Sequence, residues 1–152
     1  MKLVTFATIV SLVAGLLATG GALAQAKPET LVKQRQAAMT LQGKYYYPIR
    51  AMAQGRIPYD AATVTRNVAL LDALSKMPWD GFNASTKDVK SGTLPAAYSD
   101  AAKFKEGSER LMADVAKLVA ATKGGDDAAV KAQILVVDKT CNGCHEDFRE
   151  RQ

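Results

Sequence analysis

From residue 29 onward, apolar residues recur three or four positions apart, which is the spacing of one face of an α-helix. Alternating runs of β-branched residues are absent, and no Asn-Gly or Asp-Gly turn lies between two such runs. Hydrophobic residues make up 48% of the 152-residue chain, a proportion typical of a folded globular protein. The sequence therefore predicts an all-α fold with one core.

Proline and glycine divide this periodic region into four expected helices, at about 29–54, 59–77, 95–122 and 127–149. Pro48 lies inside the first helix and is expected to kink or break it. Residues 78–94 form a long irregular stretch, which we expect to cover part of the molecule. Four amphipathic helices with short or moderate connections predict an antiparallel four-helix bundle. The residues expected to face inward on the first and last helices are Val32, Arg35, Met39, Gln42, Tyr46, Ile49, Val130, Ile134, Val137, Cys141, Cys144 and Phe148.

The first 24 residues have the pattern of a cleaved secretory signal peptide. Lys2 is followed by a mainly apolar run over 3–20 and by the small-residue pattern Ala22-Leu23-Ala24. An uncleaved membrane anchor is the alternative, because the run is nearly long enough to span a bilayer. The small-residue site and the single basic flank favour cleavage, which would leave 25–152 as one exported domain without a membrane span.

Five consecutive residues, Cys141-Asn142-Gly143-Cys144-His145, carry the chemistry of the chain. C-x-x-C-H is the signature of covalent c-type haem attachment. Residues i and i+3 of a helix share one face, so both thiols can reach the two vinyl groups on one porphyrin edge. The following histidine can act as an axial ligand to the iron. Because both cysteines continue the apolar stripe of the last helix, we expect one haem c in the bundle core.

Two other uses of this motif fit the sequence less well. A redox-active dithiol of the thioredoxin type requires a βαβ setting, whereas this chain is expected to be helical. A structural zinc site requires four protein ligands, and the two cysteines with the single histidine supply three.

The whole region after the signal peptide resembles the cytochrome c′ family, the class II c-type cytochromes. The similarity lies in the C-terminal C-x-x-C-H motif and in five further segments. These segments are Lys27-Pro28-Glu29 with 35–39, Pro58-Tyr59-Asp60-Ala61-Ala62, Pro78-Trp79, and 98–104. The resemblance implies that Cys141 and Cys144 form the haem thioethers and that His145 is the axial iron ligand. It also places Phe148 and Arg149 on the proximal side, although Arg149 is alternatively a solvated terminal charge.

On the distal side of the haem, the resemblance assigns Met39 to the position of an apolar side chain that leaves the iron five-coordinate and high-spin. Met39 is then a lid over the iron, or its thioether is the sixth ligand. In six-coordinate relatives the methionine ligand lies about one turn later, which is Gln42 here and favours the lid. Arg35 and Gln36 match positions near the haem propionates. Alternatively, the Arg35 guanidinium lies in water over the end of the bundle.

The function implied by this family is a periplasmic, gas-binding haem protein that takes nitric oxide and carbon monoxide and acts in nitric oxide scavenging or electron transfer. The alternative is a six-coordinate His/Met low-spin cytochrome that exchanges electrons with a redox partner. An enzymatic role is disfavoured because the chain has no second histidine, carboxylate pair or nucleophile–base pair near Met39.

The charge pattern limits the kinds of partner. The formal net charge of +5 includes Lys2 of the signal peptide, and the remaining basic residues form no cluster. We therefore expect no binding to nucleic acid. The resemblance implies a homodimer formed through the first two helices. Tyr45, Tyr46 and Tyr47 are consecutive, so at least one ring must leave the core stripe and is available as an interface anchor.

Overall fold

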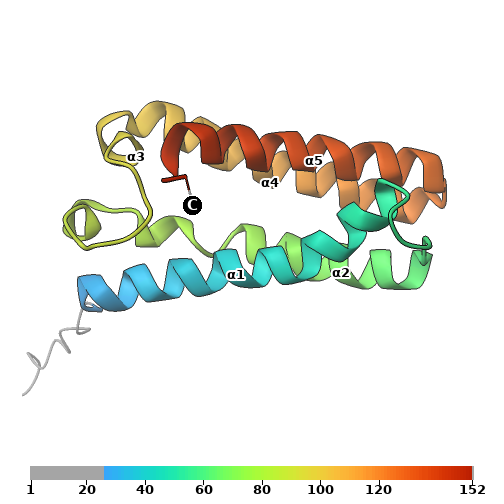
Figure 1. Ribbon diagram of the computed structural model, residues 1–152, viewed down its shortest axis with the longest axis horizontal. Helices are drawn as coiled ribbons and strands as arrows, with labels where there is room; N and C mark the ends of the chain where they lie inside the picture. The colour runs from blue at the N-terminus through green and yellow to red at the C-terminus, as the bar shows by residue number, and fades with distance from the viewer. Residues whose placement is uncertain (1–25, 152) are drawn as a thin grey trace, which may run out of the picture.

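The computed structural model describes residues 26–151, and the expected signal peptide lies outside this range. The expected all-α, four-helix bundle is confirmed, and its four long helices alternate in direction along the molecule (Figure 1). They are α1 (Pro28–Ala53), α2 (Ala61–Ser75), α4 (Ala101–Gly124) and α5 (Asp127–Phe148). Helices α1 and α4 each pack against both α2 and α5. None of the helices described is long and apolar enough to cross a membrane.

Helix α1 begins at Pro28, where the missing backbone N–H has no helical partner to lose. It continues through Pro48 as one element, so the expected break is absent. Figure 1 shows the turns after this point inclined to the rest of the helix, as expected where a proline removes one intrahelical hydrogen bond.

The third expected helix is in fact two helices. A single turn, α3 (Ala96–Ser99), is followed by α4, and Asp100 separates them with a non-helical backbone. The Asp100 carboxylate accepts the N–H of Lys103 and thereby caps α4. The prediction of one helix over 95–122 was wrong because a capping aspartate outweighed the continuous apolar pattern. At the other end of α4, Gly125 takes a left-handed conformation (φ 73°), and the next residue, Asp126, caps α5.

The long connection between α2 and α3 is more regular than the sequence indicated. It contains two 3₁₀ turns, η1 (Trp79–Gly81) and η2 (Ala84–Thr86). Four of its residues offer oxygen acceptors to the buried Arg35 of α1, and the Thr86 side chain among them is fully buried. The connection lies at the end of the bundle where α1 begins and α5 ends (Figure 1).

The apolar core lies in the part of the bundle away from this connection. Side chains from all four long helices form one cluster, and several are fully shielded from water. The most deeply buried members are Ile49, Val64, Val68, Val115, Leu118, Ile134 and Val137. On α1 the inward stripe differs from the expected one at one position, because Ala38 is buried and Met39 is only half-buried.

Candidate functional site

Cys141 and Cys144 lie one turn apart near the end of α5, with both thiols free and half-buried. Burial, with the nearby carboxylate of Asp138, raises the pKa of Cys141 to about 12. Burial also raises the pKa of Cys144, with a smaller contribution from Asp147. Both sulfurs are therefore neutral thiols at neutral pH. They lie on one helix face, at the spacing that two-point attachment to a porphyrin edge requires.

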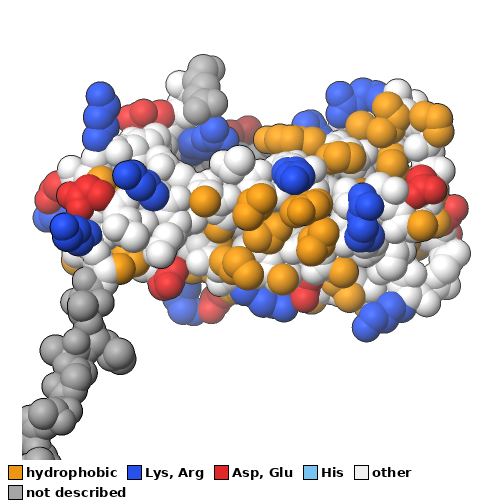
Figure 2. All heavy atoms as spheres, turned by 90° about the horizontal axis from the view of Figure 1, so that it is seen from below, with side chains coloured by type: hydrophobic (Ala, Val, Ile, Leu, Met, Phe, Trp, Pro, Cys, Tyr) orange, Lys and Arg blue, Asp and Glu red, His pale blue; other side chains and the backbone are white. Residues whose placement is uncertain are grey.

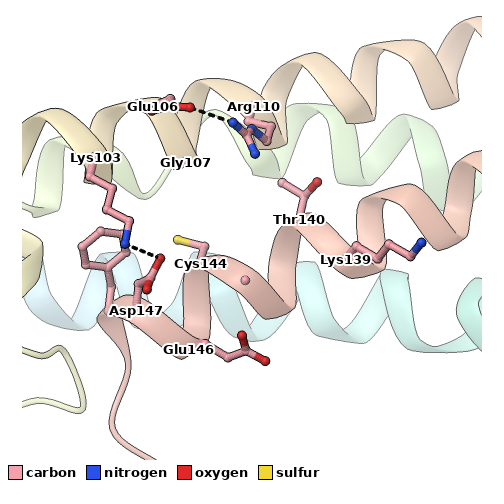
Figure 3. A pocket seen from close by; sticks show the side chains of 11 residues that line it. Lys103, Glu106, Gly107, Arg110, Lys139, Thr140, Cys144, Glu146 and Asp147 are labelled. Atoms are coloured by element: carbon pink, nitrogen blue, oxygen red, sulfur yellow. Dashed lines mark hydrogen bonds and ion pairs between the residues drawn. The ribbon is translucent and has the colours of Figure 1, made fainter.

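A groove between α4 and α5 opens onto the sulfur of Cys144. Figure 3 shows this sulfur directed at α4, where Gly107 lies opposite, and a Cβ added to Gly107 would lie 3.6 Å from Sγ. The groove has a volume of about 390 Å³. Two ion pairs border it, Lys103 with Asp147 at 3.0 Å and Arg110 with Glu106 at 2.6 Å. Because glycine stands opposite Cys144, the groove stays open at this thiol.

His145 and the two residues expected beside it lie at the end of α5. His145 is exposed as a residue, but partial burial lowers the pKa of its imidazole, and the Arg149 guanidinium lowers it further. The neutral form, which can ligate iron, is thus favoured. Phe148 is buried and packs edge-to-face on Phe104, with ring centroids 5.2 Å apart. Arg149 is exposed.

Arg35 is 3% exposed, which contradicts the alternative that placed its guanidinium in water. Nη1 donates to the Gly81 carbonyl at 2.5 Å and to the hydroxyls of Thr86 and Tyr98 at 3.1 and 2.9 Å. Nη2 donates to the hydroxyls of Ser91 and Thr93 at 3.1 and 3.2 Å. All five acceptors are neutral, so the buried positive charge meets no carboxylate among them.

The other expected residues of α1 differ in their surroundings. Met39 is half-buried, and Gln36 is exposed. Gln42, one turn after Met39, is buried and donates to the Leu74 carbonyl at 3.0 Å. The Gln42 amide is hydrogen-bonded to the backbone of α2, and its side chain has neither a thioether nor an imidazole that could bind a metal.

Two polar groupings beside the motif were not expected from the sequence. Asp138 lies one turn before Cys141, and its carboxylate is 2.9 Å from Arg50 Nε of α1. On α4, the buried Asp114 accepts the hydroxyl proton of Thr140 at 2.8 Å. Both acids fall on an inward face of an amphipathic helix, which is the signal that could have identified them.

Comparisons with known proteins agree with this geometry. The family model described as Cytochrome C′ matches residues 30–149. The chain belongs to the cytochrome c′ family. Cytochrome c′ of Rubrivivax gelatinosus is 42% identical over 127 residues, which are 82% of this chain and 98% of that protein. Its crystal structure superimposes with a TM-score of 0.78, at 40% identity and the same coverage of both chains.

Two further relatives bear on the chemistry. One is a nitric oxide complex of a variant of cytochrome c prime from Alcaligenes xylosoxidans. It superimposes with a TM-score of 0.77 at 35% identity and covers 84% of this chain and 99% of that one. Cytochrome c-556 of Rhodopseudomonas palustris is 31% identical, over 93% of this chain and 96% of that protein.

Membership of this family gives the chain its cofactor, one covalently bound haem c, and the side chains present suit it. The two thiols are unpaired with each other, share one helix face and lie in a half-buried setting. The neutral imidazole follows directly, and a buried cation on α1 lacks an anion among its hydrogen-bond partners. Thioether donors, an axial nitrogen and a group that can meet a propionate are thus all available.

Proposed function

We propose that this chain is a periplasmic, gas-binding haem protein with five-coordinate, high-spin iron. Cys141 and Cys144 form the thioethers, and His145 is the axial ligand. The bound haem supplies an iron centre that takes up one electron and binds diatomic ligands such as nitric oxide and carbon monoxide. The support from relatives is the nitric oxide complex of the Alcaligenes xylosoxidans protein.

The observation that carries this proposal is the lack of a strong sixth ligand. The sequence contains one histidine, His145. Gln42, at the position where a six-coordinate relative has its methionine, is bonded to the Leu74 carbonyl. Met39 is then a flexible apolar lid on the distal face, which limits ligand size by crowding. The sequence has no acid–base pair at helical spacing from Met39, so we propose a binding protein and not an enzyme.

Absorption spectra test this directly. We expect the ferric holoprotein to be high-spin and the Soret band of the ferrous form to shift when carbon monoxide is added. Met39→Leu should keep both properties, because in this proposal the Met39 sulfur does not bind the iron and leucine has no atom that could. Met52→Leu, in the apolar core, is the matched control. A ferrous protein that is low-spin and indifferent to carbon monoxide would refute five-coordination.

The second candidate is a His/Met electron carrier in which the Met39 sulfur binds the iron. The favouring observation is that Met39 is half-buried and lies outside the core cluster, whereas Met52 of the same helix belongs to it. The similarity to cytochrome c-556 is compatible with it. This candidate predicts a Met–iron charge-transfer band in the ferric protein, and Met39→Leu would abolish that band and convert the iron to high-spin.

We further propose that Arg35 and Gln36 lie on the propionate side of the haem. A buried guanidinium with neutral hydrogen-bond partners is stabilised by an anion, and a propionate is an anion of suitable size. Loss of a positive charge near the iron favours the ferric state. Arg35→Gln should therefore lower the midpoint potential, whereas Arg110→Gln, which removes an exposed arginine of α4, should change it much less.

The proposed assembly is a homodimer through α1 and α2. Figure 2 views the molecule from the side on which α1 lies and shows apolar side chains gathered on this face. Leu41, Tyr47 and Leu70, from these two helices, are 40%, 62% and 38% exposed. Sedimentation equilibrium should give a dimer that Tyr47→Glu dissociates. Val136→Glu, an equally severe change on α5, should leave the dimer intact.

Export is proposed on the N-terminal pattern, with cleavage after Ala24. Mass spectrometry of protein secreted to the periplasm should give a chain that begins at Gln25 and carries the mass of one haem. A chain that retains residues 1–24 would favour the membrane anchor.

A further inference from the structure

A short segment of the long connection, residues 91–94, touches both α1 and the end of α5. We call it the strap. Toward α1, the hydroxyls of Ser91 and Thr93 accept hydrogen bonds from Arg35 Nη2, at 3.1 and 3.2 Å. Charge-assisted bonds of this kind are about twice as strong as neutral ones. The strap is thus fixed to the helix that carries Met39, one turn before that residue.

Toward α5, the strap forms an isolated antiparallel bridge. Thr93 lies opposite Arg149, the Leu94 N–H donates to the Phe148 carbonyl, and the Glu150 N–H donates to the Gly92 carbonyl. Both bonds are 2.9 Å long. The bridge begins where α5 ends, and the Arg149 N–H donates to the His145 carbonyl at 3.1 Å. The turn that carries His145 is therefore held from its C-terminal side.

Aromatic contacts provide a second connection between the same two places. The Arg35 guanidinium carbon lies 4.2 Å from the centroid of the Phe82 ring. Phe82 packs on Phe104 with centroids 4.7 Å apart, and Phe104 packs on Phe148 at 5.2 Å. A polar route and an apolar route thus both run from Arg35 to the end of α5.

We infer that Arg35 and the strap are positioning elements that fix the turn bearing His145 relative to the stretch of α1 that bears Met39. The inference rests on the proposed function only for the roles of His145 and Met39, since the contacts themselves are independent of them. If His145 holds the haem iron and Met39 covers it as proposed, one hydrogen-bonded arginine would help to set the positions of both side chains. Weakening the strap should loosen the proximal side without touching any side chain proposed to contact the haem.

The test uses holoprotein carrying Ser91→Ala and Thr93→Val together, which removes both strap hydroxyls and keeps the backbone bridge and the other three Arg35 bonds. The matched control is Thr65→Val, whose hydroxyl bonds only the Ala61 carbonyl of its own helix. Hydrogen exchange of peptides covering 91–98 and 146–151 is measured by mass spectrometry. The iron–histidine stretching band of the ferrous protein is measured by resonance Raman spectroscopy.

We expect exchange in both peptides to rise roughly tenfold in the double variant and the iron–histidine band to shift or broaden, with neither change in the control. Phe82→Leu, which interrupts the aromatic route, should produce the same changes to a smaller extent. Unchanged exchange would overturn the inference, as would faster exchange with an unaltered band. A wild-type protein without an iron–histidine band would refute the proposed function, and the exchange measurement would still decide whether the strap holds the end of α5.

Discussion

The two halves of the bundle are built on different principles. Away from the long connection, seven apolar side chains with at most 1% exposure fill the interior between all four long helices. At the end with the cysteines, the deeply buried groups include Arg35 and Thr86, and Met39, Cys141 and Cys144 are only half-buried. One half is closed by apolar packing, and the other is held by hydrogen bonds around groups that suit a cofactor.

The stability of the fold and the chemistry of the haem site therefore depend largely on different parts of the bundle. Apolar packing contributes most of the folding free energy and tolerates no voids. Directed hydrogen bonds fix positions while they leave room between side chains. Substitutions in the apolar half should therefore change the free energy of unfolding, and substitutions at the cysteine end should change the haem.

The largest expected effect concerns the two cysteines. Replacing Cys141 and Cys144 together by alanine removes both sulfurs, so no covalent bond to haem can form. In a host that attaches haem, the wild-type chain should keep haem on a denaturing gel and the double variant none. Thr65→Val is the control that should stain fully. A double variant that still stained would contradict the assigned attachment site.

In the apolar half, Ile134→Ala should lower the free energy of unfolding by about 3 kcal/mol, because Ile134 is fully buried and its loss leaves a cavity. Denaturant unfolding measures the change. Val136→Ala, two residues away and 40% exposed, should cost less than about 0.5 kcal/mol. Haem staining should be unaffected in both, and equal destabilisation by the two variants would disprove the contrast between the halves.

Between the halves, Asp114 links α4 to Thr140 of α5. Burial alone would raise the pKa of Asp114, but the Thr140 hydroxyl and the Lys117 ammonium together lower it. Thr140→Val should lower the free energy of unfolding by about 1.5 kcal/mol at neutral pH, because it removes a hydrogen bond to a charged group. These interactions stabilise the ionised carboxylate and are lost when it is protonated. The difference in unfolding free energy between the wild type and the variant should therefore shrink below pH about 4. Unfolding measured against pH checks this, and a constant difference would contradict it.

Tyr46→Phe should lower the free energy of unfolding by about 1 kcal/mol, less than Ile134→Ala or Thr140→Val. The Tyr46 hydroxyl donates to the Ile134 carbonyl at 2.9 Å. Burial, reinforced by the charge of Asp138, raises the pKa of this phenol well above its ordinary value. Tyrosine in the unfolded chain ionises near pH about 10, so the wild type loses stability as pH rises beyond that. The deficit of the variant should therefore shrink in alkaline solution, and a deficit independent of pH would refute this.

The sequence was sufficient for the parts of the fold that depend on periodicity. Ile49, Ile134 and Val137 recur at helical spacing, and each is fully buried. The haem cofactor was equally predictable, because the C-x-x-C-H motif that indicates it consists of five consecutive residues. The ends of α2 and α5 fell within about two residues of their expected positions, since Asp60 and Asp126 are recognisable caps.

What the sequence could not supply depends on contacts between distant segments. The buried state of Arg35 requires acceptors from Gly81 to Tyr98, and nothing local to Arg35 indicates them. The break at Asp100 is a competition between a cap and a helical pattern that periodicity alone does not resolve. Ala38, and not Met39, is buried on the inward face of α1, because packing against the other helices sets the rotation of this helix.

The left-handed turn at Gly125 has a consequence for the order of folding. Because this turn is so short, α4 and α5 form a hairpin from neighbouring stretches of chain, and closing it costs little loop entropy. Gly107 and Cys144 both belong to this hairpin, whereas α1, which carries Arg35 and Met39, packs on it from a distant part of the chain. We expect the attachment surface to mature early and α1 to close over it late.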